Sequence, residues 1–144
     1  MATSIDAAGS SNIERPARIV VAEDDREMRR LVADCLRQEG YEIFEVCDGA
    51  ELLVRVEDTF FLRPVPGSVD LFVTDIRMPA YTGLEIVSSF RDAGICVPVV
   101  IMTAFGTAEI REQATALGAE LLEKPFKLAA LRALVRRLLQ QCNN

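Results

Sequence analysis

The sequence of 144 residues contains no histidine and no tryptophan. Without histidine, the chain cannot use an imidazole as a base or carry a phosphoryl group on one, so a partner must supply such a residue. The four cysteines (Cys35, Cys47, Cys96 and Cys142) are widely spaced and form no C-x-x-C pair. This spacing argues against a zinc site and favours reduced thiols that act as small hydrophobic side chains.

The sequence also lacks any apolar run of the length of about 20 residues that spans a bilayer. Its first residues lack the charged and then apolar pattern of a signal peptide, so we expect a cytoplasmic protein without a membrane partner.

The 16 basic and 22 acidic side chains give a net charge of −6. That balance argues against nucleic-acid binding through a broad basic face. No glycine-rich phosphate-binding motif follows a predicted strand, which disfavours a nucleotide or flavin binder.

Half of the residues are hydrophobic, which is typical of a folded globular protein, and the length suits one domain. Residues 1–15 are rich in alanine, serine, asparagine and aspartate without a periodic pattern, and we predict a flexible tail there. Residues 16–142 are predicted to form a single folded domain, and residues 60–68 a loop that is longer than usual for this class.

Five short segments have the composition of strands. Continuous apolar runs indicate strands that are buried on both faces, whereas the alternating run at 41–46 indicates a strand at a sheet edge. The predicted strands are Arg18–Ala22, Tyr41–Val46, Val69–Thr74, Val97–Met102 and Leu121–Leu122.

Apolar residues at helical spacing separate these strands, and Asp48 and Thr107 precede two of the helices. Strands that alternate with helices predict an α/β fold, a doubly wound five-stranded parallel sheet with five helices. The apolar stripes are Met28, Leu31, Val32, Cys35 and Leu36; Leu52, Leu53 and Val56; Val87 and Phe90; Ile110, Ala114 and Leu117; and Leu128, Leu131, Leu134, Val135 and Leu138.

Polar residues of particular types follow the strands. The first strand leads to Glu23-Asp24, the third to Asp75, the fourth to Thr103 and the fifth to Lys124. Parallel strands bring their carboxyl ends to one sheet edge, so these side chains are expected to meet. Converging carboxylates raise one another's pKa unless a cation neutralises them, and Mg²⁺ suits a few oxygen ligands with room for water.

A carboxylate in such a site can attack phosphorus and become an aspartyl phosphate. Positive charge and a hydroxyl donor are then needed around the phosphoryl oxygens, and Lys124 and Thr103 have the right chemistry. Each residue also has an ordinary structural interpretation: Asp75 as a turn residue, Thr103 as a helix cap and Lys124 as a solvated cation. The coincidence of several such residues at the ends of several strands favours the functional interpretation.

These residues resemble the receiver domains of two-component response regulators. The resemblance covers roughly residues 17–141 and rests on V-V-A-E-D-D followed by M-R-R, V-T-D-I-R-M-P-x-x-x-G, I-M-T-A and K-P-F. It implies a flavodoxin-like, chemotaxis-regulator-like fold with strand order 2-1-3-4-5. It also implies that this chain holds a receiver domain and no output domain.

The resemblance implies roles for the acidic residues that follow the first and third strands. Asp75 is expected to be the phosphoacceptor, and Glu23 and Asp24 the acidic pair that binds Mg²⁺, with Asp25 outside that pair. Asp24 would ligate the metal directly and Glu23 largely through water, while the backbone carbonyl of Arg77 would complete the set.

Thr103 is expected to be the switch hydroxyl and Lys124 the cation that pairs with the phosphoryl group, with a cis bond between Lys124 and Pro125. One residue departs from the family pattern, and two others occupy positions that tune the site. Leu121 stands three residues before the lysine, where the family usually has an aromatic side chain. Phe105 and Arg77, two residues after Thr103 and Asp75, are expected to adjust the lifetime of the phosphoryl group.

The implied function is a phosphorylation-controlled switch. A phosphohistidine of a sensor kinase or phosphotransfer protein would donate to Asp75, and the added charge would change the face formed by the fourth helix, fifth strand and last helix. That face is also a possible homodimer interface. The alternatives are a Mg²⁺-dependent phosphatase with an aspartyl nucleophile and an inert docking module; Arg77 stands where such a phosphatase has its general acid.

Overall fold

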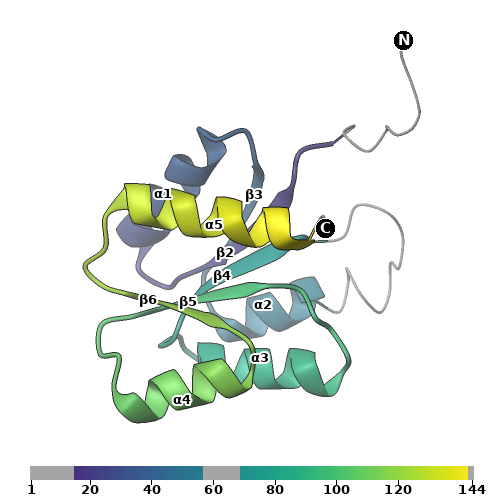
Figure 1. Cartoon of the computed structure of the whole chain (residues 1–144), viewed down its shortest axis with the longest axis vertical. Coiled ribbons are helices and arrows are strands. Elements are labelled where there is room, and N and C mark those ends of the chain that lie inside the picture. Colours follow the sequence, from purple (N-terminus) through teal and green to yellow (C-terminus); the bar gives the residue numbers. More distant parts are fainter. Residues whose placement is uncertain (1–14, 57–68, 143–144) are drawn as a thin grey trace.

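The structure is a computed structural model that describes residues 15–56 and 69–142. It contains a parallel sheet in the order β3-β2-β4-β5-β6 (Figure 1). In chain order this is the predicted 2-1-3-4-5 arrangement, with the alternating segment at one edge. The strands are β2 (Arg18–Ala22), β3 (Glu42–Val46), β4 (Leu71–Asp75), β5 (Val99–Thr103) and β6 (Glu120–Glu123).

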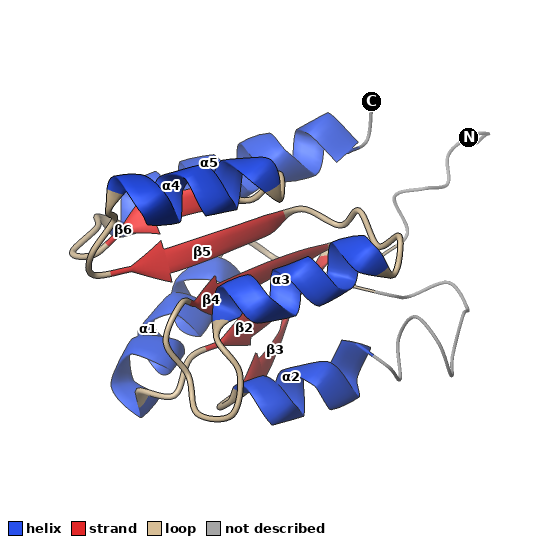
Figure 2. Cartoon of the chain, turned by 90° about the horizontal axis from the view of Figure 1, so that it is seen from below, coloured by secondary structure: helices blue, strands red, loops and turns tan. Residues whose placement is uncertain are grey.

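Five helices in the described residues cover the two faces of the sheet. Helices α1 and α5 lie on one face, and α2, α3 and α4 lie on the other (Figures 1 and 2). The doubly wound α/β fold is therefore confirmed. The helices are α1 (Arg26–Arg37), α2 (Gly49–Val56), α3 (Gly83–Asp92), α4 (Ala108–Ala116) and α5 (Leu128–Cys142).

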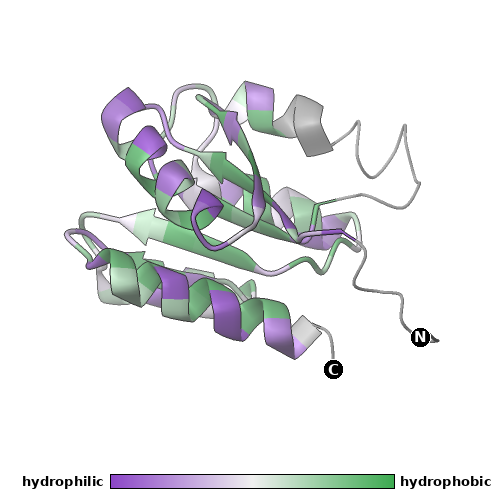
Figure 3. Cartoon of the chain, turned by 90° about the horizontal axis from the view of Figure 1, so that it is seen from above, coloured by the Kyte–Doolittle hydropathy of each residue, from purple (hydrophilic) through white to green (hydrophobic). Residues whose placement is uncertain are grey.

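Each face of the sheet has its own hydrophobic core, because successive strand residues point to opposite sides. Val21 and Val73 face α1 and α5, whereas Val20 and Phe72 face α2, α3 and α4. On the second face, Phe72 packs against Phe90 of α3 with ring centroids 4.7 Å apart. Figure 3 shows the same division, with hydrophobic strands between helices that carry hydrophilic residues on their outer sides.

Helix termini follow the capping signals in the sequence. The Asp25 carboxylate caps α1 and the Thr107 side chain caps α4, while Asp48 accepts a 2.8 Å hydrogen bond from the Glu51 N–H at the start of α2. Gly40, just after α1, has φ +94°, a conformation that glycine adopts without a Cβ penalty.

Two strands begin later than the apolar runs suggest. β5 starts at Val99 because Pro98 has no N–H to donate to the ladder. β4 starts at Leu71, and just before it the Asp70 N–H donates to the Arg18 carbonyl at 2.8 Å while the Asp70 carboxylate accepts the Arg18 N–H at 2.8 Å.

One prediction for α1 is wrong. Leu31 was expected on the buried stripe, but its side chain is 49% exposed. The buried face runs from Cys35 through Val32 and Leu36 to Ala33, and successive residues are about 100° apart around the axis. Leu31 therefore lies beyond the Cys35 edge of this face, and Ala33 extends the face at its opposite edge.

Some expectations lie outside the described residues: the flexible tail, the loop at 60–68 and the side chains of Leu53 and Val56. Among the helices of 15–56 and 69–142, none has the length and apolarity that a membrane span needs.

Candidate functional site

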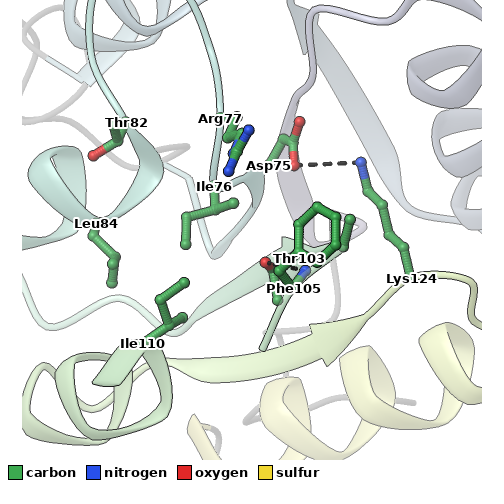
Figure 4. Close-up of a pocket in the computed structure, with 10 residues that line it drawn as sticks. Asp75, Ile76, Arg77, Thr82, Leu84, Thr103, Phe105, Ile110 and Lys124 are labelled. Carbon is green, nitrogen blue, oxygen red and sulfur yellow. Dashed lines mark hydrogen bonds and ion pairs between the residues drawn. The ribbon is translucent and has the colours of Figure 1, made fainter. Parts of the chain in front are cut away.

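The carboxyl ends of four neighbouring strands meet at one edge of the sheet. Asp75 and Thr103 are the last residues of β4 and β5, whereas Glu23 and Lys124 directly follow β2 and β6. Figure 4 shows Asp75 and Lys124 facing each other, with Thr103 beside them. The parallel fold therefore brings together the polar residues that the sequence places after separate strands.

Glu23, Asp24 and Asp75 form a cluster of carboxylates. Each offers an oxygen that lies within 4.8 Å of the other two. Glu23 is 1% exposed and Asp75 7% exposed, whereas Asp24 is exposed to solvent. Three carboxylate oxygens at this spacing are suitable ligands for a hard divalent cation, so this donor set fits Mg²⁺. Asp25 takes no part in the cluster, because its carboxylate caps α1.

Lys124 is the cation of the site. Its Nζ lies 3.0 Å from Glu23 Oε1 and 3.3 Å from Asp75 Oδ1. Its backbone N–H donates a 2.7 Å hydrogen bond to the Thr103 carbonyl, and the Lys124–Pro125 peptide bond is cis, as expected. The ammonium group is thus paired with two buried carboxylates rather than solvated.

The electrostatics of the site follow from burial and proximity. Burial raises the pKa of Glu23 from 4.5 to about 7, although hydrogen bonds from Lys124 and the Asp25 backbone oppose the change. Burial alone would lower the pKa of Lys124, but the hydrogen bond to Glu23 and the charge of Asp75 raise it overall. The lysine therefore remains charged.

Thr103 is 1% exposed, and its Oγ1 accepts a 3.1 Å hydrogen bond from the Phe105 N–H. It is not the cap of the following helix, because Thr107 fills that position. Its hydroxyl retains a proton to donate, and the residue lines the same pocket as Asp75 and Lys124.

The turn between β4 and α3 approaches Asp75 closely. A Cβ on Gly83 would lie 2.6 Å from the Asp75 carbonyl oxygen, so only glycine fits there without a shift of the backbone. Gly83 also donates its N–H to the Ile76 carbonyl at 3.0 Å. Ala80 has φ +77°, the left-handed region that favours glycine.

Arg29 is a contributor that the sequence analysis did not identify. Its Nη1 donates a 2.9 Å hydrogen bond to the Glu23 carbonyl, and its Nε donates to Glu45 of β3 at 3.3 Å. Arg29 therefore ties the backbone that carries the acidic pair to the neighbouring strand. The sequence shows only that Arg29 belongs to the M-R-R run, which does not specify a bond to the Glu23 carbonyl.

The site opens into a pocket of about 360 Å³. Ile76, Leu84 and Ile110 form its apolar wall, and Arg77 and Phe105 lie at its mouth. The Arg77 guanidinium carbon lies 5.9 Å from the centroid of the Phe105 ring, a distance typical of a cation–π contact.

This fold, with an acidic cluster, a lysine and a threonine at the carboxyl edge of its sheet, defines the receiver class of signalling proteins. The family model of the response regulator receiver domain matches residues 19–136. The chain belongs to this family and is a receiver domain of two-component signalling. Members of the family normally bind Mg²⁺ and interact with histidine kinases.

Curated relatives agree with this assignment. The chain is 35% identical over 133 residues to the alkaline phosphatase synthesis transcriptional regulatory protein SphR of Synechococcus elongatus, a match that covers 89% of this chain and 51% of the relative. It is 36% identical over 118 residues to the transcriptional regulatory protein PdtaR of Mycobacterium tuberculosis, covering 81% and 53%. The chain thus spans about half the length of these relatives.

Solved structures show the same fold. The chemotaxis protein CheY4 of Vibrio cholerae matches with a TM-score of 0.74 and 26% identity, covering 85% of this chain and 98% of that one. The signal receiver domain of a putative Luxo repressor protein from Vibrio parahaemolyticus matches with a TM-score of 0.79 and 25% identity, covering 90% and 93%.

Proposed function

We propose that Asp75 accepts a phosphoryl group from the phosphohistidine of a sensor kinase or a phosphotransfer protein. Among the described residues that line the pocket, Asp75 alone offers a carboxylate. This carboxylate lies 3.3 Å from Lys124 Nζ, and the two observations together support the proposal. Because this sequence contains no histidine, the donor imidazole is proposed to belong to a partner.

The transfer is a single displacement at phosphorus. An Asp75 carboxylate oxygen forms the new P–O bond while the P–N bond to the donor imidazole breaks, and the electron pair remains on the imidazole. Lys124 pairs with one phosphoryl oxygen and the Thr103 hydroxyl donates to another, so both groups stabilise the charge of the transferred group. Arg77 occupies the position where a phosphatase with an aspartyl nucleophile has its general acid. The competing phosphatase mechanism is therefore disfavoured, because this acid is missing.

Glu23, Asp24 and Asp75 would hold Mg²⁺ together with the backbone carbonyl of Arg77. The bound ion would supply the positive charge that three carboxylates and an incoming phosphoryl group require. Asp24, the exposed member of the cluster, is proposed as a direct ligand, and the buried Glu23 as one that acts largely through water.

The face formed by α4, β6 and α5 is proposed to change on phosphorylation and to contact an output domain or partner. In α4, Ala114 is the one buried residue, while Ile110 and Leu117 are partly buried against the core. A helix with so few buried contacts is suited to a shift of position. This face carries the ion pairs Arg111–Glu123 and Arg137–Glu120, so charges of both signs lie side by side on it. We also propose this face as a homodimer interface.

We propose that residues 16–142 form the receiver domain of a cytoplasmic regulator. Because relatives about twice as long are named transcriptional regulatory proteins, control of transcription is the proposed output. The net charge of −6 supports an output that does not rely on direct nucleic-acid binding by this domain.

Incubation with Mg²⁺ and acetyl phosphate tests this function. We expect an acid-stable, hydroxylamine-sensitive phosphoryl adduct by mass on the wild type, none on Asp75→Asn, and an undiminished one on the control Asp34→Asn, at an exposed residue of α1. An undiminished adduct on Asp75→Asn would contradict the proposal. Absence of any adduct would favour an inert docking module, and turnover of many phosphoesters per protein would favour a phosphatase.

A further inference from the structure

The residue where the family usually has an aromatic switch is aliphatic here. Leu121 pairs with Ile101 in the sheet and packs, partly buried, against the core beneath α4. Leu121 is only partly buried, and as a leucine it offers no aromatic ring. An aromatic ring that couples Asp75 to α4 would therefore belong to another residue.

Phe105 is the exposed aromatic residue next to the phosphoacceptor site. Its side chain is 65% exposed, and it lies in the loop that joins Thr103 to α4. Exposure of so large an apolar side chain is unfavourable, so a nearby apolar site would attract it.

While its carbonyl accepts the Thr107 N–H at 3.0 Å, Phe105 makes two other contacts, both with residues of the phosphoacceptor site. Its N–H donates to Thr103 Oγ1 at 3.1 Å, and its ring lies 5.9 Å from the Arg77 guanidinium carbon. Thr103 and Arg77 both line the pocket around Asp75 (Figure 4). A new dianionic group on Asp75 would accept the Thr103 hydroxyl proton, which the bond from the Phe105 N–H leaves free, and would attract the Arg77 guanidinium more strongly than an aromatic ring does.

The pocket supplies an apolar site beside this loop. Ile76, Leu84 and Ile110 line it together with Phe105, and its volume is about 360 Å³. Ile110 belongs to the first turn of α4. A ring that packs against Ile110 would therefore couple the state of Asp75 directly to the position of α4.

We propose that Phe105 replaces the missing aromatic switch. Phosphorylation of Asp75 draws Thr103 and Arg77 toward the phosphoryl group, and the Phe105 ring then moves into the pocket and packs on Leu84 and Ile110. This inference rests on the proposed function, because it requires the phosphoryl group on Asp75.

The absence of tryptophan makes the proposal measurable, since Phe105→Trp creates a single-tryptophan protein. On treatment with Mg²⁺ and acetyl phosphate, the emission should shift to shorter wavelength and acrylamide quenching should fall as the ring is buried. Tyr81→Trp, at another exposed aromatic position, should show no such change. In the double variant Asp75→Asn/Phe105→Trp, the emission should also stay constant.

The native side chain is tested by methyl NMR. Phosphorylation should move the Leu84 and Ile110 methyl resonances upfield through the ring current of Phe105, and this shift should be absent from Phe105→Leu protein whose mass shows the adduct. Unchanged quenching and methyl shifts in protein whose mass shows the adduct would overturn the switch alone. Failure to form the adduct would overturn the proposed function and the switch together.

Discussion

At the scale of single residues, Glu23 is a buried carboxyl that protonates near neutral pH when no metal is bound. Its pKa in the folded protein, about 7, lies above its ordinary value of 4.5. The folded state therefore binds the proton more tightly than the unfolded state, and Glu23 lowers stability as the pH rises from 4.5 through 7.

Glu23→Gln should therefore stabilise the metal-free protein at pH 8 by on the order of 2 kcal/mol, with the difference vanishing below pH 4.5. Urea denaturation of both proteins in EDTA, at pH 4 and pH 8, measures this effect. Glu27→Gln, at an exposed position of α1, is the control and should change little. A pH-independent difference between Glu23→Gln and wild type would contradict the assigned ionisation.

Ala80 carries backbone strain in the turn after Asp75, because its φ is +77°. A left-handed conformation costs an alanine about 1 kcal/mol or more, and part of that is recovered with glycine. Ala80→Gly is expected to raise the free energy of unfolding by roughly 0.5 kcal/mol. By contrast, Ala133→Gly in the exposed surface of α5 should lower it by about 1 kcal/mol. If both substitutions destabilise the protein equally, the turn is not strained.

At the scale of secondary-structure elements, the start of α1 and strand β3 jointly position the acidic pair. Arg29 of α1 holds the Glu23 carbonyl and the Glu45 side chain, and Glu45 also pairs with Arg37 at 3.1 Å. The loop between β2 and α1 is thereby fixed from both sides, although none of these three side chains reaches the metal-binding cluster.

Arg29→Met should weaken Mg²⁺ binding by about tenfold, as is common when a group that orients metal ligands is lost. The neighbouring Arg30→Met is the matched control, because Arg30 is exposed on the same helix. Titration calorimetry of the three proteins with Mg²⁺ gives the affinities, and circular dichroism verifies the fold. Equal affinities for Arg29→Met and Arg30→Met would show that Arg29 does not position the ligands.

Arginine side chains anchor helix α4 at both ends. Near its C-terminal end, the Arg91 guanidinium donates to the carbonyls of Leu117 at 2.7 Å, Ile95 at 2.8 Å and Val97 at 3.0 Å. Its first turn carries Ile110, which borders the pocket. The first turn is also held, because Arg111 Nε donates to the Gly106 carbonyl at 3.2 Å and Arg111 pairs with Glu123 of β6.

At the scale of the whole molecule, the sequence predicts the fold well because its signals are local. The buried strands are continuous apolar runs, and Asp48 and Thr107 precede their helices directly. The meeting of Glu23, Asp75, Thr103 and Lys124 then follows from parallel topology alone. Local patterns sufficed for these features.

Features that depend on rotation or tertiary contact were not predictable. The exposure of Leu31 depends on how α1 is rotated against the sheet, which its apolar spacing leaves open. The Arg29 bond to a backbone carbonyl and the contact between Arg77 and Phe105 leave no pattern in the sequence, because each joins side chains whose rotamers are set by packing.

The central claim is that Asp75 becomes phosphorylated, and chemical identification of the modified residue tests it most directly. After incubation with acetyl phosphate and Mg²⁺, borohydride reduction converts an aspartyl phosphate to homoserine, which peptide mass spectrometry locates. We expect homoserine at position 75, dependent on Mg²⁺ and lost in Asp75→Asn. Homoserine at position 24 or another acidic residue, with position 75 unmodified, would contradict it.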